Sequence, residues 1–320
     1  MKRHIDCLTV MLTNQCPLRC AHCGPRSGPG ERGALKLELI ISALDEARER
    51  LCRVVNFSGG EPFILGESLT AFVEAAAQRS MIPRVTTGAY WSNSAAAAKR
   101  RLEPLAAAGL RQLAVSCSDA HREFVPIENV IEAARAARHY GIELYLALGT
   151  SKTSKTCSRT VREAFEAAGE LPPWLYESPY IPFGRASDQV PASDLILQPV
   201  ERFVGACPSL TVNPTIHADG NVTGCAVVFG RECPALAYGN IHETPLGEIL
   251  DLMNCDPLAA WIHKIGVVEL KRFIEDNSNI KFDEHYVNIC HLCGTIMNSP
   301  EALEFLEAVG LRSTEEAIAT

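Results

Sequence analysis

The sequence lacks the features that mark several classes of protein. Its longest apolar run, residues 142–149, is much shorter than the roughly 20 residues that a transmembrane helix needs. The N-terminus carries no secretory signal, because Asp6 and Cys7 follow the first basic residues at once. Lys and Arg number 30 against 38 Asp and Glu, and the net charge of −8 argues against a general nucleic-acid or anionic-membrane binder. We therefore expect a cytoplasmic protein whose partners include neither nucleic acid nor membrane.

Signs of disorder and of repetition are also missing. Apolar residues make up 47% of the 320 residues and charged residues 21%, which is typical of an ordinary soluble enzyme with a sizeable core. We find no internal repeat. The only compositionally biased stretch is the Ser/Thr/Lys segment 151–160, which we predict to be a loop without chemistry.

Short apolar runs alternate with amphipathic stretches up to about residue 180. The predicted strands are residues 7–12, 54–57, 84–87, 113–116, 143–148 and 174–176, and the predicted helices are 37–51, 69–79, 95–108, 130–140 and 161–168. A spacing of about 30 residues is that of a βαβ unit, so we expect parallel strands with right-handed crossovers. Six units are too few for a closed eight-fold barrel. An open, partial barrel and a doubly wound sheet are the two candidates, and in both the chemistry collects after the strand C-termini.

This rhythm breaks after Pro191, and we predict two domains, residues 1–190 and 191–320. In the second, segments 211–217 and 221–225 flank an Ala-Asp-Gly turn and predict a hairpin. A helix is expected from about residue 245 to 254, and another over 300–311 with Ser299 as its N-cap.

Thirteen cysteines are unusual in a reducing compartment, where crowded thiols bind metal or perform redox chemistry. Cys16, Cys20 and Cys23 lie within eight residues, directly after the first predicted strand. A structural zinc ion takes four protein ligands, and no fourth ligand of matching spacing lies nearby except His22. A [4Fe–4S] cluster held by three cysteines would keep one iron open, where an amine and a carboxylate could chelate. The scattered Cys7, Cys52, Cys117 and Cys157 are most simply buried apolar residues.

The Cys-x3-Cys-x2-Cys spacing resembles the signature of the radical S-adenosylmethionine (SAM) superfamily. A second motif, Ser58-Gly59-Gly60-Glu61-Pro62, directly follows the second predicted strand and is similar to the Gly-Gly-Glu-Pro motif of that family. The resemblance implies that the three cysteines hold a [4Fe–4S] cluster and that Gly59, Gly60, Glu61 and Pro62 hold the methionine amino group of SAM. The residue types suit this role, because glycine admits close backbone approach and a buried carboxylate suits an ammonium group.

Weaker family marks follow the later strands. His22 occupies the position before the last cysteine, which is usually aromatic and packs on the adenine. Thr87 lies in a Thr-Thr-Gly stretch after the third strand, and Ser116 follows the fourth strand, where the family places polar groups toward the ribose. Residues 148–151 depart from the family's Gly-x-Ile-x-Gly-x-x-Glu stretch, so we assign no adenine contact there. The resemblance implies a partial (β/α)6 barrel, which favours that fold over the doubly wound sheet.

Six further cysteines lie between residues 207 and 293. They resemble the C-terminal SPASM and twitch extensions of radical SAM enzymes, which carry auxiliary [4Fe–4S] clusters, although a full SPASM module needs more cysteines than six. The resemblance implies a twitch module with one auxiliary cluster on Cys207, Cys225, Cys290 and Cys293, and it leaves out Cys233 and Cys255. A zinc site with four thiolates remains the alternative.

The resemblance also implies a reaction. An electron donor such as flavodoxin or ferredoxin reduces the cluster, SAM is cleaved, and the resulting 5′-deoxyadenosyl radical takes a hydrogen atom from an unactivated C–H bond. The protein then has to position the substrate and exclude water. Polar residues after the strands are candidates to line the pocket: Tyr90, Asp119, His121 and Arg185.

Three hypotheses concern the substrate. In the first, a ribosomally made peptide is epimerised or cross-linked, and an epimerase would use Cys117 or Cys233 as its hydrogen donor. In the second, a small metabolite such as an aminoglycoside or sugar is oxidised or epimerised. In the third, the chain is a non-catalytic iron–sulfur protein. Because the cysteine loop begins at residue 16, we expect no N-terminal peptide-recognition domain, which weakens the first hypothesis without removing it.

Overall fold

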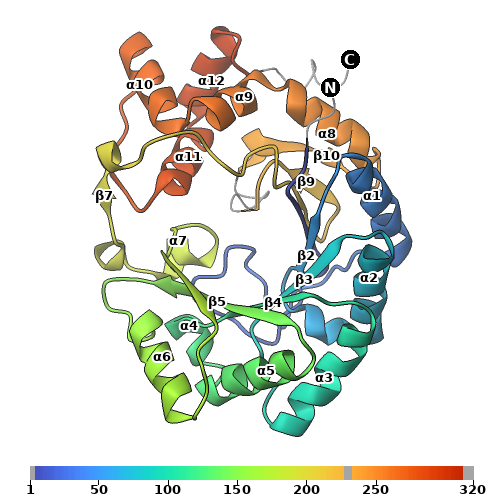
Figure 1. The fold of residues 1–320 in the computed structure, drawn as a ribbon. Helices are drawn as coiled ribbons and strands as arrows, with labels where there is room; N and C mark the ends of the chain where they lie inside the picture. The colour runs from blue at the N-terminus through green and yellow to red at the C-terminus, as the bar shows by residue number, and fades with distance from the viewer. Residues whose placement is uncertain (1–3, 227–232, 313–320) are drawn as a thin grey trace.

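The computed structural model describes residues 4–226 and 233–312, which form an α/β fold around one curved nine-stranded sheet (Figure 1). The order of its strands is β10-β9-β8-β1-β2-β3-β4-β5-β6. The parallel strands of the first part are β1 (Cys7–Met11), β2 (Val54–Ser58), β3 (Ile82–Thr87), β4 (Gln112–Ser116), β5 (Glu143–Thr150) and β6 (Trp174–Pro179). The first six strands of the sequence therefore appear in the sheet in sequential order.

This order decides between the two predicted folds. A doubly wound sheet reverses its strand order at a switch point, whereas right-handed crossovers that always step in one direction curl the sheet into a barrel. Five helices surround the outside of the curved sheet in Figure 1: α1 (Leu37–Glu49), α2 (Glu67–Gln78), α3 (Ala95–Ala107), α5 (Ile127–His139) and α6 (Ser158–Ala167) among the described residues. The short α4 (Asp119–Arg122) follows β4 at the strand ends, where its His121 lines the cavity. The partial (β/α)6 barrel is confirmed.

Alternation along the strands separates core from pocket. In β2, Val55 and Phe57 are fully buried, and the Phe57 ring lies 6.0 Å from the ring of Phe72 on α2. The residues between and after them, Asn56 and Ser58, line the cavity inside the barrel. A period of two thus gives each strand one apolar face toward the helices and one polar face toward the cavity.

The second part of the chain continues the same sheet. After α7 (Arg185–Gln189), the two-residue strand β8 (Thr215–Ile216) pairs in parallel with β1, and β9 (Asn221–Thr223) and β10 (Ala237–Asn240) follow antiparallel. This is the predicted hairpin. A separate two-stranded sheet joins β7 (Gln198–Pro199) to β11 (His285–Tyr286).

Five helices complete this part: α8 (Leu246–Cys255), α9 (Pro257–Lys264), α10 (Val267–Asn277), α11 (Ile289–Met297) and α12 (Pro300–Ala308). The predictions of α8 and α12 are confirmed, and the Ser299 hydroxyl accepts the Ala302 N–H as expected of an N-cap. The other three helices were not predicted, although Asp256 ahead of Pro257 is an N-cap signal.

None of the described helices combines the length and the apolar character that crossing a lipid bilayer requires.

Candidate active site

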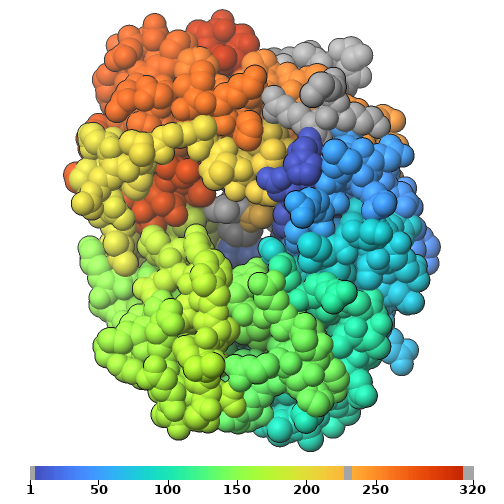
Figure 2. All heavy atoms as spheres, in the orientation of Figure 1, coloured from blue at the N-terminus to red at the C-terminus, as the bar shows by residue number. Residues whose placement is uncertain are grey.

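A cavity of about 450 Å³ lies inside the barrel at the C-terminal ends of the strands. Residues at the ends of all six parallel strands, or in the loops that follow them, contribute to its wall. The molecule is visibly hollowed near its centre in Figure 2. Of the predicted site residues, those that line it are Cys16, Cys20, His22, Cys23, Gly59, Gly60, Glu61, Thr87 and Ser116, joined by His121 and Arg185.

The cysteine loop and the Gly-Gly turn are packed backbone to backbone. The Gly60 N–H donates to the Thr13 carbonyl and the Glu61 N–H to the Gln15 carbonyl, at 2.5 and 2.9 Å. A Cβ atom on Gly60 would overlap the Gln15 carbonyl group, and one on Gly59 (φ 131°) would overlap Thr13. Glycine is therefore required at both positions by the approach of the cysteine loop itself.

Glu61 is a buried carboxylate with only neutral donors around it. Its side chain is accessible for 1% of its area and accepts from the N–H groups of Phe63 and Gly88 and from the Thr87 hydroxyl, at 3.1, 2.9 and 2.8 Å. Burial raises the pKa of Glu61 to about 7, although these hydrogen bonds act to lower it. A cationic ligand is the partner that this carboxylate lacks among the described residues.

Arg185 donates three hydrogen bonds to backbone carbonyls of the cysteine loop. Its backbone N–H donates to the Cys23 carbonyl and its Nε–H to the Cys20 carbonyl, both at 3.0 Å, and Nη2 donates to the Ser27 carbonyl. The residue is 7% exposed and forms no ion pair with a carboxylate in the described part of the chain. The preceding Gly184 (φ 57°) approaches the Cys23 and Gly24 carbonyls where a Cβ atom would collide.

The three thiols and this cation fit an anionic iron–sulfur cluster. All three cysteines are free, and burial raises the pKa of Cys16 and of Cys20 to about 12, while the positive charge of Arg185 lowers both. Cluster assembly therefore has to release protons from these thiols. A buried guanidinium without a carboxylate partner is costly unless a negative group lies near it, and a thiolate-bound cluster supplies one.

His22 and His121 form a neutral pair beside the cysteines. Their ring centroids are 4.6 Å apart, and the ring of Tyr180 lies 4.7 Å from His22. Burial lowers the pKa of His22 to about 4 and that of His121 well below its usual range, so both rings are uncharged near neutral pH. The Nδ1 atoms of both are buried and lack a hydrogen-bond partner among the described residues. His121 was predicted only as a pocket-lining residue, and its contact with His22 depends on the tertiary structure.

Some predicted residues lie elsewhere. Pro62 is buried and begins a short 3₁₀ turn beside the cavity rather than lining it. Tyr90 and Asp119 are not in the cavity wall; Asp119 accepts the backbone N–H groups of residues 155 and 156. Cys117 is fully buried in the hydrophobic core, between Ser116 and Ser118, which do line the cavity.

The C-terminal cysteines form a second cluster of thiols. Cys207, Cys225, Cys290 and Cys293 line one small cavity with apolar walls. The last two lie in the first turn of α11, where the Asn288 side chain accepts the N–H of Cys290 at 3.1 Å. From the sequence, these four cysteines were grouped only by the resemblance to twitch modules. In the structure they line the same cavity.

The two remaining cysteines differ from each other. Cys233 is 2% exposed. Its thiol lies near those of Cys225 and Cys293: the charge of Cys225 raises the pKa of Cys233, and the charge of Cys233 raises the pKa of Cys293. Cys255 is exposed at the end of α8. Within the described ranges, no three Cys, His, Asp or Glu side chains converge on a point that suits a single metal ion. A cubane, by contrast, needs thiols spread around a space, because each binds a different iron.

Comparison with known proteins agrees with the motifs. Residues 10–155 match the profile of the Radical SAM superfamily. The putative peptide biosynthesis protein YydG of Bacillus subtilis (strain 168) is 21% identical over 314 residues, which cover 93% of this chain and 94% of that protein. The GTP 3',8-cyclase of Rhodococcus opacus (strain B4) is 31% identical over 147 residues, 42% of this chain and 40% of that protein.

A solved structure of similar fold is native anSMEcpe with bound AdoMet and Cp18Cys peptide. It is 14% identical, with a TM-score of 0.57, and the match covers 95% of this chain and 97% of that one. At this identity the similarity establishes the shared fold over nearly the whole chain.

Proposed function

Because residues 10–155 of this chain form a radical SAM domain, which uses a [4Fe–4S] cluster and SAM, we propose that the protein modifies a ribosomally made peptide by epimerisation or cross-linking. The observation that carries the proposal is the cavity in which the cysteine loop, the Gly-Gly turn and Glu61 meet at the strand ends. The peptide substrate is supported by the similarity, over almost the full length of both chains, to a putative peptide biosynthesis protein.

We assign the cavity residues as follows. Cys16, Cys20 and Cys23 would hold the cluster, and Glu61 would accept the ammonium group of the SAM methionine with Gly59, Gly60 and Thr87 around it. His22 would pack on the adenine, and Ser116 would face the ribose. When bound, the cluster and SAM supply a 5′-deoxyadenosyl radical. The chain's own contribution is to orient the substrate carbon and to exclude water.

We further propose one auxiliary [4Fe–4S] cluster on Cys207, Cys225, Cys290 and Cys293, within a C-terminal domain that begins near residue 191. The cavity that these four cysteines share supports a common metal centre, and the resemblance to twitch modules favours a cluster over zinc. Two clusters predict about eight iron atoms per chain, whereas about four with one zinc would contradict the assignment. The double variant Cys290→Ala, Cys293→Ala should lose about half of the iron and keep the SAM-binding cluster.

For an epimerase, a thiol has to return a hydrogen atom to the substrate carbon radical, which forms a C–H bond and leaves a thiyl radical on sulfur. Cys117 and Cys233 are the proposed donors. Both are buried members of the hydrophobic core, and neither lines the large cavity, so the two stay equal candidates. Product made in deuterated water should then gain one deuterium, and either Cys117→Ala or Cys233→Ala should stop turnover without loss of iron.

A small-molecule substrate is the second candidate. It is favoured by the similarity to GTP 3',8-cyclase, but that match covers only 40% of the relative and is confined to part of this chain. A non-catalytic iron–sulfur protein is the third. An electron donor of the flavodoxin or ferredoxin type is proposed for either enzyme.

The deciding experiment is anaerobic incubation of the reconstituted protein with SAM and dithionite. Release of 5′-deoxyadenosine is expected from the wild type and not from Cys20→Ala. No release from fully iron-loaded protein would leave only the non-catalytic hypothesis.

A further inference from the structure

Three aromatic side chains form a continuous row on the inner face of β5 and β6: Tyr145, Trp174 and Tyr176, named here the aromatic row. The ring centroids of Tyr145 and Trp174 are 6.0 Å apart, and those of Trp174 and Tyr176 are 6.2 Å apart. Tyr176 lines the large cavity. Trp174 lies two residues earlier on the same strand, so alternation places it on the same face, toward the N-terminal end of the barrel.

The aromatic row is unusually open to solvent. Trp174 is 66% exposed and Tyr176 53% exposed, although both face the inside of the barrel. Their strand, β6, is the last of the sheet and pairs only with β5 in the described part of the chain. Exposed Trp and Tyr side chains on the open edge of a cavity are typical of a binding surface, where they supply contact area at little entropic cost.

Arg84 closes the row at its inner end. Its guanidinium lies 5.5 Å from the centroid of the Tyr145 ring, and Nε and Nη2 both donate to Oε1 of Gln112, at 2.9 and 2.7 Å. Nε2 of Gln112 in turn donates to Glu143 at 2.8 Å. The neutral amide of Gln112 therefore lies between Arg84 and Glu143, and none of the ion pairs found among the described residues includes Arg84.

A half-buried arginine with a neutral acceptor on one side and an aromatic face on another is arranged to receive a carboxylate. The guanidinium fork matches a carboxylate in two parallel hydrogen bonds, which are stronger than those to a neutral amide. The ring faces stack on flat peptide groups and on apolar side chains.

We propose that the aromatic row and Arg84 bind the substrate peptide and select a carboxylate on it, either an Asp or Glu side chain or the C-terminus. This inference rests on the proposed peptide function and specifies its substrate class. Trp174 lies four residues before Ser178, which lines the cavity, so the two residues are roughly 13 Å apart along β6.

The test uses the full-length, iron-loaded protein with SAM and two libraries of amidated octapeptides. Both are random except for one fixed position, which is Asp in the first library and Asn in the second. The wild type should retain the Asp library roughly tenfold better than the Asn library. Arg84→Gln should abolish this preference, and Arg84→Lys should keep part of it. Glu143→Gln should increase it, because a competing carboxylate is removed.

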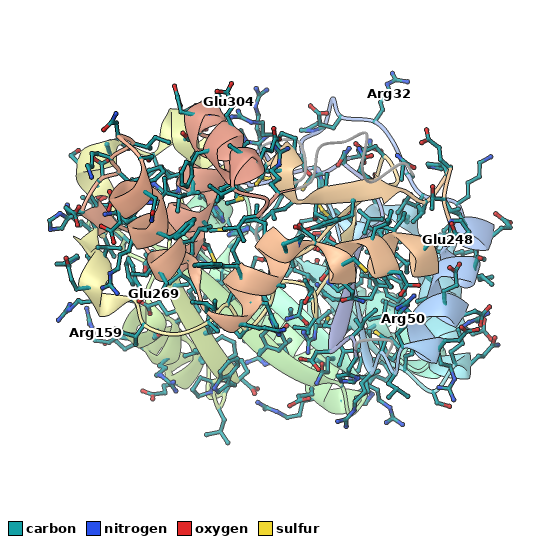
Figure 3. The ribbon with its side chains drawn as sticks, turned by 90° about the horizontal axis from the view of Figure 1, so that it is seen from above. Arg32, Arg50, Arg159, Glu248, Glu269 and Glu304 are labelled. Atoms are coloured by element: carbon teal, nitrogen blue, oxygen red, sulfur yellow. The ribbon has the colours of Figure 1, made fainter. Side chains whose placement is uncertain are left out.

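Two controls separate charge selection from general effects. Arg159→Gln removes an exposed arginine on the outside of α6 (Figure 3), and it should leave the preference unchanged. Trp174→Ala should weaken retention of both libraries equally, since stacking does not distinguish Asp from Asn. Iron content and circular dichroism must match the wild type for every variant that is compared.

The remaining outcomes would contradict the selection of a carboxylate, the binding surface or the peptide function. If the wild type retains both amidated libraries and an Asn library with free C-termini equally, or if its preference survives Arg84→Gln, the selection of a carboxylate is contradicted while the peptide function stands. No retention of either library would contradict the binding surface. If a small metabolite then stimulated release of 5′-deoxyadenosine, the proposed peptide function would fall as well. The amidated peptides carry no C-terminal carboxylate. If the wild type retains an Asn library with free C-termini and Arg84→Gln does not, the selected carboxylate is the C-terminus.

Discussion

At the scale of single residues, Glu61 shows opposing effects on one carboxylate. Burial raises the pKa of Glu61 from an ordinary 4.5 to about 7. Hydrogen bonds from three neutral donors lower the pKa, but by less than burial raises it. Because the folded pKa lies above the unfolded one, the contribution of Glu61 to stability is present below pH 4.5 and is lost as the pH rises through 7. In the ligand-free protein, ionisation of Glu61 therefore lowers the free energy of unfolding at neutral pH. A bound ammonium group would offset this loss.

SAM affinity should depend on pH through this residue. Below about pH 7 the Glu61 carboxyl group has to lose a proton before it can pair with the ammonium group. The dissociation constant of SAM should therefore rise up to tenfold for each unit by which the pH falls. Above about pH 8 the α-amino group of SAM loses its own proton, and affinity should fall again. Equilibrium dialysis from pH 5.5 to 8.5 measures both limbs. Glu61→Gln should bind more weakly and lose the acidic limb; an acidic limb that persists in this variant would refute the assignment.

Arg185 acts on the cysteine loop both by hydrogen bonds and by charge. Arg185→Gln should lower the free energy of unfolding by about 2–4 kcal/mol, because buried carbonyls lose a charged donor. It should also make the cluster harder to reduce, since a nearby positive charge favours the reduced, more negative state. Potentiometric titration followed by electron paramagnetic resonance measures the second effect. Arg185→Lys should restore the potential in part, and Arg26→Gln, at an exposed arginine of the same loop, should leave it nearly unchanged.

At the scale of elements, the turn after β2 depends on its fit against the loop after β1. Both segments follow neighbouring parallel strands, so the register of β1 with β2, which ends at Met11 opposite Ser58, brings their ends together. The Gly60 N–H then reaches the Thr13 carbonyl, and no side chain fits between the two backbones. The motif and the cysteine loop are thus one structural unit.

Gly60→Ala should therefore damage the cysteine loop although Gly60 is not a ligand. The new methyl group would overlap the Gln15 carbonyl, and we expect the iron bound after reconstitution to fall toward that of the C-terminal site alone. Iron analysis and the SAM-dependent spectroscopic change of the cluster report this loss. Gly30→Ala is the matched control, because a Cβ atom there meets open space. Normal iron content in Gly60→Ala would show that the backbone contact is not needed.

At the scale of the whole molecule, a strand pairing and a helix contact are among the places where the C-terminal part joins the barrel. Strand β8 pairs with β1, and α8 packs on α1. At the helix contact, Arg50 has a side chain only 2% exposed, donates to the Gly247 carbonyl and pairs with Asp251 at 2.9 Å. Glu46 accepts the Gly247 N–H at 2.7 Å. Figure 3 shows Arg50 and Glu248 on neighbouring helices at this side of the molecule.

Arg50→Ala should weaken this junction. The substitution removes a buried side chain and leaves the Gly247 carbonyl without its donor, whereas Asp251 is 60% exposed and can be solvated, so we expect a loss of about 2 kcal/mol in the free energy of unfolding. Limited proteolysis should reveal earlier cleavage in the C-terminal part. Arg272→Ala, which removes an exposed helical ion pair with Glu269, should cost less than about 1 kcal/mol. Equal stability of the two variants would mean that the junction does not depend on Arg50.

Much of the barrel follows from local patterns. Apolar runs of period two and amphipathic stretches of period 3.6 placed the six parallel strands and five helices to within a few residues. Strands β5 and β6 extend past their predicted ends, to Thr150 and Pro179, because pairing between them outweighs the turn signals of Gly149 and Ser178. Helices α9–α11 and the short α4 and α7 were not predicted, because each has at most about three turns and shows only a brief amphipathic pattern.

The sequence alone determined that a three-cysteine loop and a Gly-Gly-Glu-Pro turn follow consecutive strands, because both motifs are local and parallel strands bring their C-terminal ends to one edge. Only the tertiary structure decided that the guanidinium of Arg185 lies under the cysteine loop, that the thiols from residues 207 to 293 share a cavity, and that the aromatic row is open to solvent. Such contacts join residues far apart in the chain, and their distances depend on every crossover between them rather than on any short-range periodicity.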